Sequence, residues 1–142
     1  MKQEDIIALF QRFEAAVLKH KDIEFWSARD LCPLFGYTKW SNFIQAISKA
    51  KESAQAAGML VSEHFADASK SSPMPNGGIR EIDDVLLTRY ACYLIAQNGD
   101  PRKDEIAFAQ NYFAIQTRRA ELVQQRILES ERVIARQKLF AA

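Results

Sequence analysis

The most constraining feature of this sequence is residues 102–142, which contain neither glycine nor proline. A row of mostly apolar or small residues recurs there at alternating spacings of three and four, the a and d pattern of a coiled coil. At about 1.5 Å per residue, one helix over this segment would be roughly 60 Å long, which exceeds the width of a small domain. We therefore predict a long C-terminal helix whose far end overhangs the domain. The row consists of Ile106, Ala109, Phe113, Gln116, Ala120, Val123, Ile127, Ser130 and Ile134.

The overhanging part of this helix predicts a homodimer. Its first two heptads can pack on the domain core, but the later apolar side chains would remain in water. Burying each of them stabilises by roughly 1.5 to 3 kcal/mol, and a second copy offers that burial. Glu121 and Arg126 can pair between two such helices. Fraying, or folding back along the same chain, is the alternative. The predicted dimer contacts are Val123, Ile127 and Ile134.

The rest of the chain has the pattern of one α+β domain, mainly helical with a small antiparallel sheet. The sequence has 142 residues, 48% hydrophobic and 26% charged, which excludes a disordered or low-complexity protein. We assign the domain to residues 1–116 and a helical extension to residues 117–142, continuous with a helix that starts near Pro101. Further helices are expected at 3–19, 28–35, 39–57 and 88–99, and strands at 22–26, 65–72 and 79–85, with the last two joined by the Pro/Gly-rich loop 73–78.

The boundaries of these helices follow from capping residues. A hydroxyl or carboxylate side chain before a helix accepts hydrogen bonds from its first backbone N–H groups, and glycine ends a helix by adopting a left-handed conformation. Proline fits the first helical position, so Asp100-Pro101 predicts the start of the last helix. The expected N-caps are Ser27, Thr38 and Thr88, and the expected stops are Gly36, Gly58 and Gly99.

Several classes of protein can be set aside. The longest apolar stretches fall far short of the ~20 residues of a membrane helix, so we expect no contact with membrane. Acidic residues within the first five positions are atypical of a secretory signal, which leaves the cytoplasm as the expected compartment. Cys32 and Cys92 should be reduced and buried, while His20 and His64 lack metal-ligand spacing. With the common nucleotide-binding and hydrolase motifs also missing, we expect no enzymatic activity, no metal and no cofactor.

The two helices around Gly36 have the outline of a helix-turn-helix, with the following hairpin as a wing. The second helix carries amides, which can pair with adenine edges, and lysines, which can contact phosphate or guanine. The alternative is that this polar side is only the solvated face of an amphipathic helix. Lys70 and Arg80 lie near the ends of the hairpin. The candidate recognition residues on the second helix are Lys39, Asn42, Gln45 and Lys49.

Three more basic residues, Arg89, Arg102 and Lys103, lie at helix starts. A positive charge there opposes the helix dipole, which favours a bound anion or a neighbouring carboxylate. Pairing with nearby acids such as Asp100 is the simpler alternative.

Three stretches of the chain form a specific pattern. The first is Trp26 to Leu31 and Leu34 to Tyr37, followed by Phe43, Ile47 and Ala50-Lys51; the second is Leu87 to Pro101; the third is Tyr112 to Arg118 with Glu121. Together they cover about residues 24–121 and resemble the DNA-damage-inducible protein D (DinD) family. The resemblance implies a domain similar to the DNA-binding domains of phage antirepressors and of BRO proteins from large DNA viruses, here at residues 1–116. Family members are longer than this chain.

The resemblance implies a function as well as a fold. It points to a non-enzymatic protein of the bacterial SOS response that modulates or inactivates filaments of the recombinase RecA on single-stranded DNA, with Arg29 added to the binding residues above. Two alternatives stay open: a sequence-specific DNA-binding regulator, and a protein-interaction or dimerisation module. A regulator would lose affinity steeply with salt and would discriminate among duplexes, whereas a filament modulator need bind no free DNA.

Overall fold

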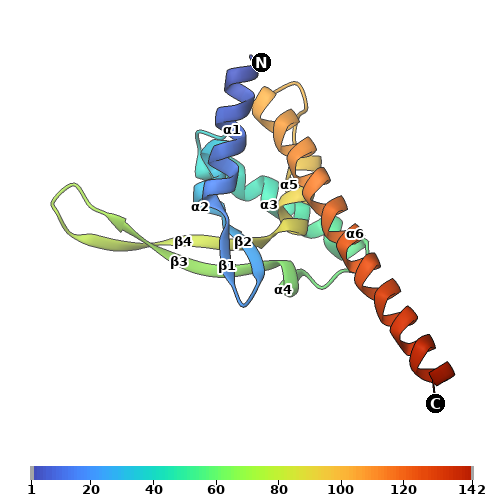
Figure 1. The fold of residues 1–142 in the computed structure, drawn as a ribbon. Coiled ribbons are helices and arrows are strands. Elements are labelled where there is room, and N and C mark those ends of the chain that lie inside the picture. The colour runs from blue at the N-terminus through green and yellow to red at the C-terminus, as the bar shows by residue number, and fades with distance from the viewer. Residues whose placement is uncertain (1, 142) are drawn as a thin grey trace.

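A computed structural model describes the backbone of residues 2–141 and the side chains through residue 139. It confirms an α+β fold that is mainly helical, with a four-stranded antiparallel sheet in the order β1-β2-β4-β3. One hairpin projects far from the body, and the last helix runs past the body on the other side (Figure 1). The elements are α1 Gln3–Ala16, β1 Leu18–His20, β2 Ile23–Ser27, α2 Ala28–Leu34, α3 Trp40–Ala56, α4 Val61–His64, β3 Phe65–Pro73, β4 Ile79–Thr88, α5 Arg89–Gln97 and α6 Asp104–Ala141.

The projecting hairpin is formed by β3 and β4, as the Pro/Gly-rich loop predicted. The strands pair from Phe65 opposite Leu87 out to Pro73 opposite Ile79. At the tip, the Gly77 N–H donates to the Met74 carbonyl at 3.0 Å, and Gly77 has a φ of 87°, which favours glycine. Most side chains of the outer half are exposed, so this half is stabilised mainly by its own strand pairing.

The first helix is shorter than predicted, and a strand takes its place. The 3–4 spacing of apolar residues reaches Val17, but Val17 is extended and β1 follows it. Lys21 and Asp22 then both have positive φ, the conformation of a two-residue type I′ turn, and β1 returns as β2. This turn contains no glycine, so its residues carry no recognisable hairpin signal.

The predicted helix boundaries are partly right. Gly36 and Gly58 end α2 and α3 with φ values of 82° and 81°, and the Thr88 hydroxyl accepts from the Ala91 N–H at 3.3 Å. Thr38 does not cap α3, because the cap position is Lys39 and has no side-chain cap bond.

The last helix begins three residues later than predicted, at Asp104. The Asp100 carboxylate accepts from the backbone N–H and the guanidinium of Arg102, at 3.0 Å each, and so holds a turn before the helix. From Asp104, α6 runs without interruption to Ala141, which confirms the long C-terminal helix.

The core is aromatic and joins α1, α2, β2 and α6. The Phe13 ring lies 5.9 Å from that of Phe35 and 5.6 Å from that of Phe113, while Trp26 meets Phe113 edge-on at 5.3 Å. All four side chains are buried. The first part of the α6 seam is therefore buried by its own domain, as predicted.

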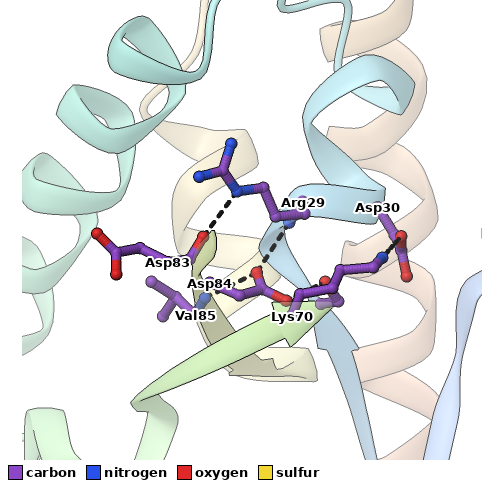
Figure 2. A network of polar contacts seen from close by, with 7 residues as sticks. Arg29, Asp30, Lys70, Asp83, Asp84 and Val85 are labelled. Atoms are coloured by element: carbon purple, nitrogen blue, oxygen red, sulfur yellow. Dashed lines mark hydrogen bonds and ion pairs between the residues drawn. The ribbon is translucent and has the colours of Figure 1, made fainter. Parts of the chain in front are cut away.

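A buried carboxylate fixes α2 to the sheet (Figure 2). Asp84 on β4 is 5% exposed, and its Oδ1 accepts from the backbone N–H groups of Arg29 at 3.0 Å and Val85 at 2.8 Å. Its Oδ2 accepts from the Ser27 hydroxyl at 2.5 Å. Ser27 is at the predicted cap position, but its hydroxyl bonds Asp84 rather than the helix. Asp84 therefore supplies the cap, and its negative charge suits a helix N-terminus.

Two further contacts tie the hairpin to α2. The Arg29 Nε donates to the Asp83 carbonyl at 2.7 Å, and Lys70 on β3 forms an ion pair with Asp30. The side chains of Asp83 and Asp84 point in opposite directions, as expected of neighbours on a strand (Figure 2). The outer hairpin is thus oriented by contacts from the middle of its two strands to α2.

The two cysteines are buried and unpaired, as predicted. Burial raises the pKa of the Cys32 thiol, against the opposing charge of Arg29, and raises the pKa of the Cys92 thiol further. At pH 8.5, where an ordinary thiol is about half ionised, both should stay protonated. We expect alkylation of the native chain by iodoacetamide to be much slower than alkylation in urea. Rapid native labelling of Cys92 would contradict the described burial.

Removing the Asp84 carboxylate should destabilise the domain. Asp84→Ala leaves three donors without their acceptor in a buried place, so we expect the free energy of unfolding to fall by about 3 kcal/mol. Asp83→Ala is the matched control: the Asp83 side chain is exposed and only its backbone carbonyl is used, so a loss within ~0.5 kcal/mol is expected. Urea unfolding measures both, and equal losses would refute the role of Asp84.

Candidate nucleic-acid interface

The predicted recognition residues share one exposed stripe of α3. Lys39 directly precedes this helix, and Asn42, Gln45 and Lys49 follow at spacings of three and four. All four side chains are exposed, while the other side of α3 packs into the core through residues such as Phe43 and Ile47. We call these four residues the α3 stripe. The helix holds its amides and amines in solvent, where a phosphate, a base edge or a carboxylate can reach them.

Arg29 lies at the junction of α2, α3 and the hairpin. Its guanidinium carbon lies 3.8 Å from the centroid of the Trp40 ring, a cation–π contact with the first residue of α3. Within residues 2–139, hydrogen bonds use only its Nε, so its two terminal nitrogens are available to an anion at the edge of the α3 stripe. Trp40 thereby joins the site as an aromatic platform that the sequence pattern placed only in the core.

Lys103 also lies beside this region. Its Nζ lies 5.5 Å from the centroid of the Tyr37 ring, in the turn between α2 and α3. Arg102 does not join it, because its guanidinium pairs with Asp100 at 3.0 Å. The hydrogen bonds from Arg102 lower the pKa of Asp100, so this pair persists at neutral pH. The simpler alternative for Arg102, pairing with a nearby acid, is the one that the structure shows.

The hairpin is less basic than a wing that binds phosphate would be. Lys70 is already paired with Asp30, and Arg80 is exposed near the tip, opposite Ser72. Across β3 and β4 there are four carboxylates and these two basic side chains, a net charge of −2. The exposed carboxylates would repel a DNA backbone. They belong to Asp67, Glu81 and Asp83.

Arg89 lies at a separate place. It pairs with Glu24 on β2 at 3.5 Å, in a hollow that α6 also lines through Arg119 and Val123. The ten predicted binding residues therefore do not form one face. Six belong to the α3 stripe or lie near it. Lys70 is paired with Asp30 on the hairpin, and Arg80, Arg89 and Arg102 lie elsewhere.

Asp84 is the residue that sequence reasoning missed. A signal for it exists in β4, where Ile82, Asp84 and Leu86 share one face, so that a carboxylate interrupts an otherwise apolar row. A lone carboxylate in such a row needs a buried partner. The pattern does not reveal that this partner is the start of α2.

No metal-binding group of three or more His, Cys, Asp or Glu side chains occurs in the part of the chain that the structure describes. The His64 Nδ1 lies 2.8 Å from the Thr88 hydroxyl, and its ring packs 5.1 Å from that of Tyr90, so this histidine helps to hold the start of α5. Among the described helices, none is both long and apolar enough to span a bilayer.

Comparisons with known proteins show the family to which the chain belongs. Residues 14–114 match the family described as "BRO family, N-terminal domain". A relative named "DNA damage-inducible protein D", from Escherichia coli strain K12, is 42% identical over 109 residues, which are 77% of this chain and 40% of the relative. The chain thus spans well under half the length of that relative, and no solved structure matches it significantly. The chain belongs to the BRO family, and what it shares with that family is the N-terminal domain.

Proposed function

We propose that this chain is a non-enzymatic part of the DNA-damage response that binds RecA filaments on single-stranded DNA and promotes their release. The single observation that carries the proposal is its 42% identity, over 109 residues, to a protein named "DNA damage-inducible protein D". Neither that name nor the BRO family denotes an enzyme. The chain covers only part of the relative. The main part of the proposal is therefore that the chain binds the filament, and the release of RecA is its second part.

The charge pattern favours a filament over free duplex DNA. The α3 stripe, Arg29 and Lys103 offer cations, whereas the neighbouring hairpin carries exposed carboxylates and a net charge of −2. A surface of both signs suits a target that presents DNA phosphates and protein side chains together. On naked duplex DNA the hairpin would weaken every contact that the cations make.

A release assay tests the proposal. RecA bound to labelled single-stranded DNA is mixed with the chain, and loss of RecA is followed against a sample without the chain. Naked single-stranded DNA is the control for direct binding. We expect the chain to speed the loss of RecA from the filament and to bind little naked single-stranded DNA. An unchanged loss of RecA would contradict the proposal.

The lysines of the α3 stripe should be needed for binding. Lys39→Ala with Lys49→Ala removes two exposed cations and should weaken filament binding and flatten its salt slope by ~1 for each phosphate that is no longer neutralised. Lys19→Ala with Lys21→Ala, in the exposed β1–β2 hairpin, removes the same charge and should leave binding unchanged. Stability should hardly change in either variant. Equal losses in the two pairs would mean that net charge, and not the α3 stripe, governs binding.

The second candidate is a sequence-specific duplex regulator, which Asn42 and Gln45 favour. These amides are exposed in the middle of the stripe, and Asn or Gln can bond adenine through two hydrogen bonds. A panel of duplexes at fixed salt distinguishes the two functions. Discrimination of roughly 10³ or more between duplexes, in the usual range of specific binding, would support the regulator instead.

A further inference from the structure

An apolar groove of about 470 Å³ lies between α1 and α6. Ile6 and Phe10 line it from α1, and Tyr112 and Ile115 line it from α6. The two helices are neighbours here (Figure 1), with the Phe10 and Tyr112 rings 5.7 Å apart. Ile6, Phe10 and Ile115 are nevertheless between 42 and 54% exposed. Large apolar side chains gathered this way typically mark a binding surface.

The far half of α6 carries a second apolar surface. From residue 123 to residue 139 every side chain is exposed, and this part of the helix extends clear of the body (Figure 1). At 3.6 residues per turn, Val123, Ile127 and Ile134 lie within about 60° of Tyr112 around α6, and Val133 lies on the line of Ile115. Leu128 and Leu139 lie on the opposite side of the helix. The groove and the far half thus form one stripe. The far members of the stripe, each between 51 and 55% exposed, are Val123, Ile127, Val133 and Ile134.

We propose that a second copy of the chain covers this stripe, with the two α6 helices antiparallel. In that arrangement the far half of each α6 lies in the α1–α6 groove of the other copy, and the two-fold axis passes near Gln124. With the axis between Gln124 and Gln125, Ile115 of one copy lies at the height of Ile134 of the other. A parallel pair would leave both grooves open to water. The arrangement is a closed, self-complementary interface.

One ion pair between the copies is specific to the antiparallel direction. With Ile115 at the height of Ile134, Arg118 of one copy lies at the height of Glu131 of the other, whereas an in-register parallel pair sets each charge beside its own copy. The far half also carries Arg126, Arg132, Arg136 and Lys138, so its net charge is positive and the apolar stripe must supply the association. Glu121 competes only weakly for Arg118, at 3.8 Å and well exposed.

The stripe alone provides most of the area that a stable dimer interface needs. Overlap of residues 112–137 in each copy gives a strip about 39 Å long and ~10 Å wide. Over two copies this is roughly 800 Å² in projection. The true buried surface is larger, because the α1 side chains add to it and because protruding side chains have more surface than their projection. A biological interface is expected to bury ~1,000 Å² in total.

Sedimentation equilibrium tests whether the dimer forms through this stripe. At tens of micromolar we expect the wild-type chain to have the dimer mass. Ile115→Glu in the groove and Ile134→Glu on the far half should each raise the dissociation constant by at least about 100-fold, because each change affects both halves of the interface. The control is Leu128→Glu, which alters a side chain 47% exposed on the opposite side of α6 and should leave the dimer intact.

All three positions are exposed, so circular dichroism should report an unchanged fold. A monomeric wild-type chain, or a dimer that survives Ile115→Glu, would overturn the proposal.

Disulfide cross-linking tests the direction of the helices. Chains with Ile115→Cys are mixed with chains with Ile134→Cys and oxidised gently, and the wild-type chain, whose two cysteines are buried, is the blank. The antiparallel pair predicts a disulfide between the two variants and little cross-linking of either alone. Efficient cross-linking of Ile115→Cys to itself would show a parallel pair and overturn the arrangement.

Discussion

The arrangement of the candidate interface depends on one buried carboxylate. Asp84 accepts hydrogen bonds from Ser27, from the first turn of α2 and from its own strand, so α2 can start at only one place on the sheet. Arg29 lies in that first turn, and its guanidinium contacts the ring of Trp40, the first residue of α3. The orientation of the α3 stripe relative to the hairpin therefore follows from a group that is itself hidden from any partner.

Features set by local sequence were predictable, and features set by distant partners were not. The long helix follows from spacings of three and four with no glycine or proline, and the hairpin follows from Pro73 to Gly78 between two strand patterns. The β1–β2 turn was not predicted, because Lys21 and Asp22 adopt positive φ values although neither is glycine. The side chains of the α3 stripe were predicted by type and position, since a helical period is enough to place them on one face.

The partners of the charged residues could not be predicted. Lys70 and Asp30 are forty residues apart, and Asp84 and Ser27 are 57 apart, so their pairing depends on how the sheet folds. Lys70 was therefore predicted to be a cation for DNA, but it forms an ion pair that joins the hairpin to α2. Arg102 likewise pairs with Asp100. The charge of a residue and its position in the sequence therefore do not distinguish a binding residue from a residue that forms a structural ion pair.

The two proposed surfaces would act together. α3 packs in the body of the domain against α5, α2 and α4, whereas the far half of α6 extends clear of the body, so dimerisation need not cover the α3 stripe (Figure 1). A dimer carries two α3 stripes, and a filament offers many identical sites. Two weak contacts joined in this way give an overall affinity well above that of either alone.

Hydrogen–deuterium exchange of the chain, with and without a RecA filament on single-stranded DNA, tests the central claim most directly. The account predicts slower exchange in peptides that cover residues 36–52, where the turn and the α3 stripe lie, and unchanged exchange in the β1–β2 hairpin. Protection confined to α6, with the α3 peptides unaffected, would contradict it.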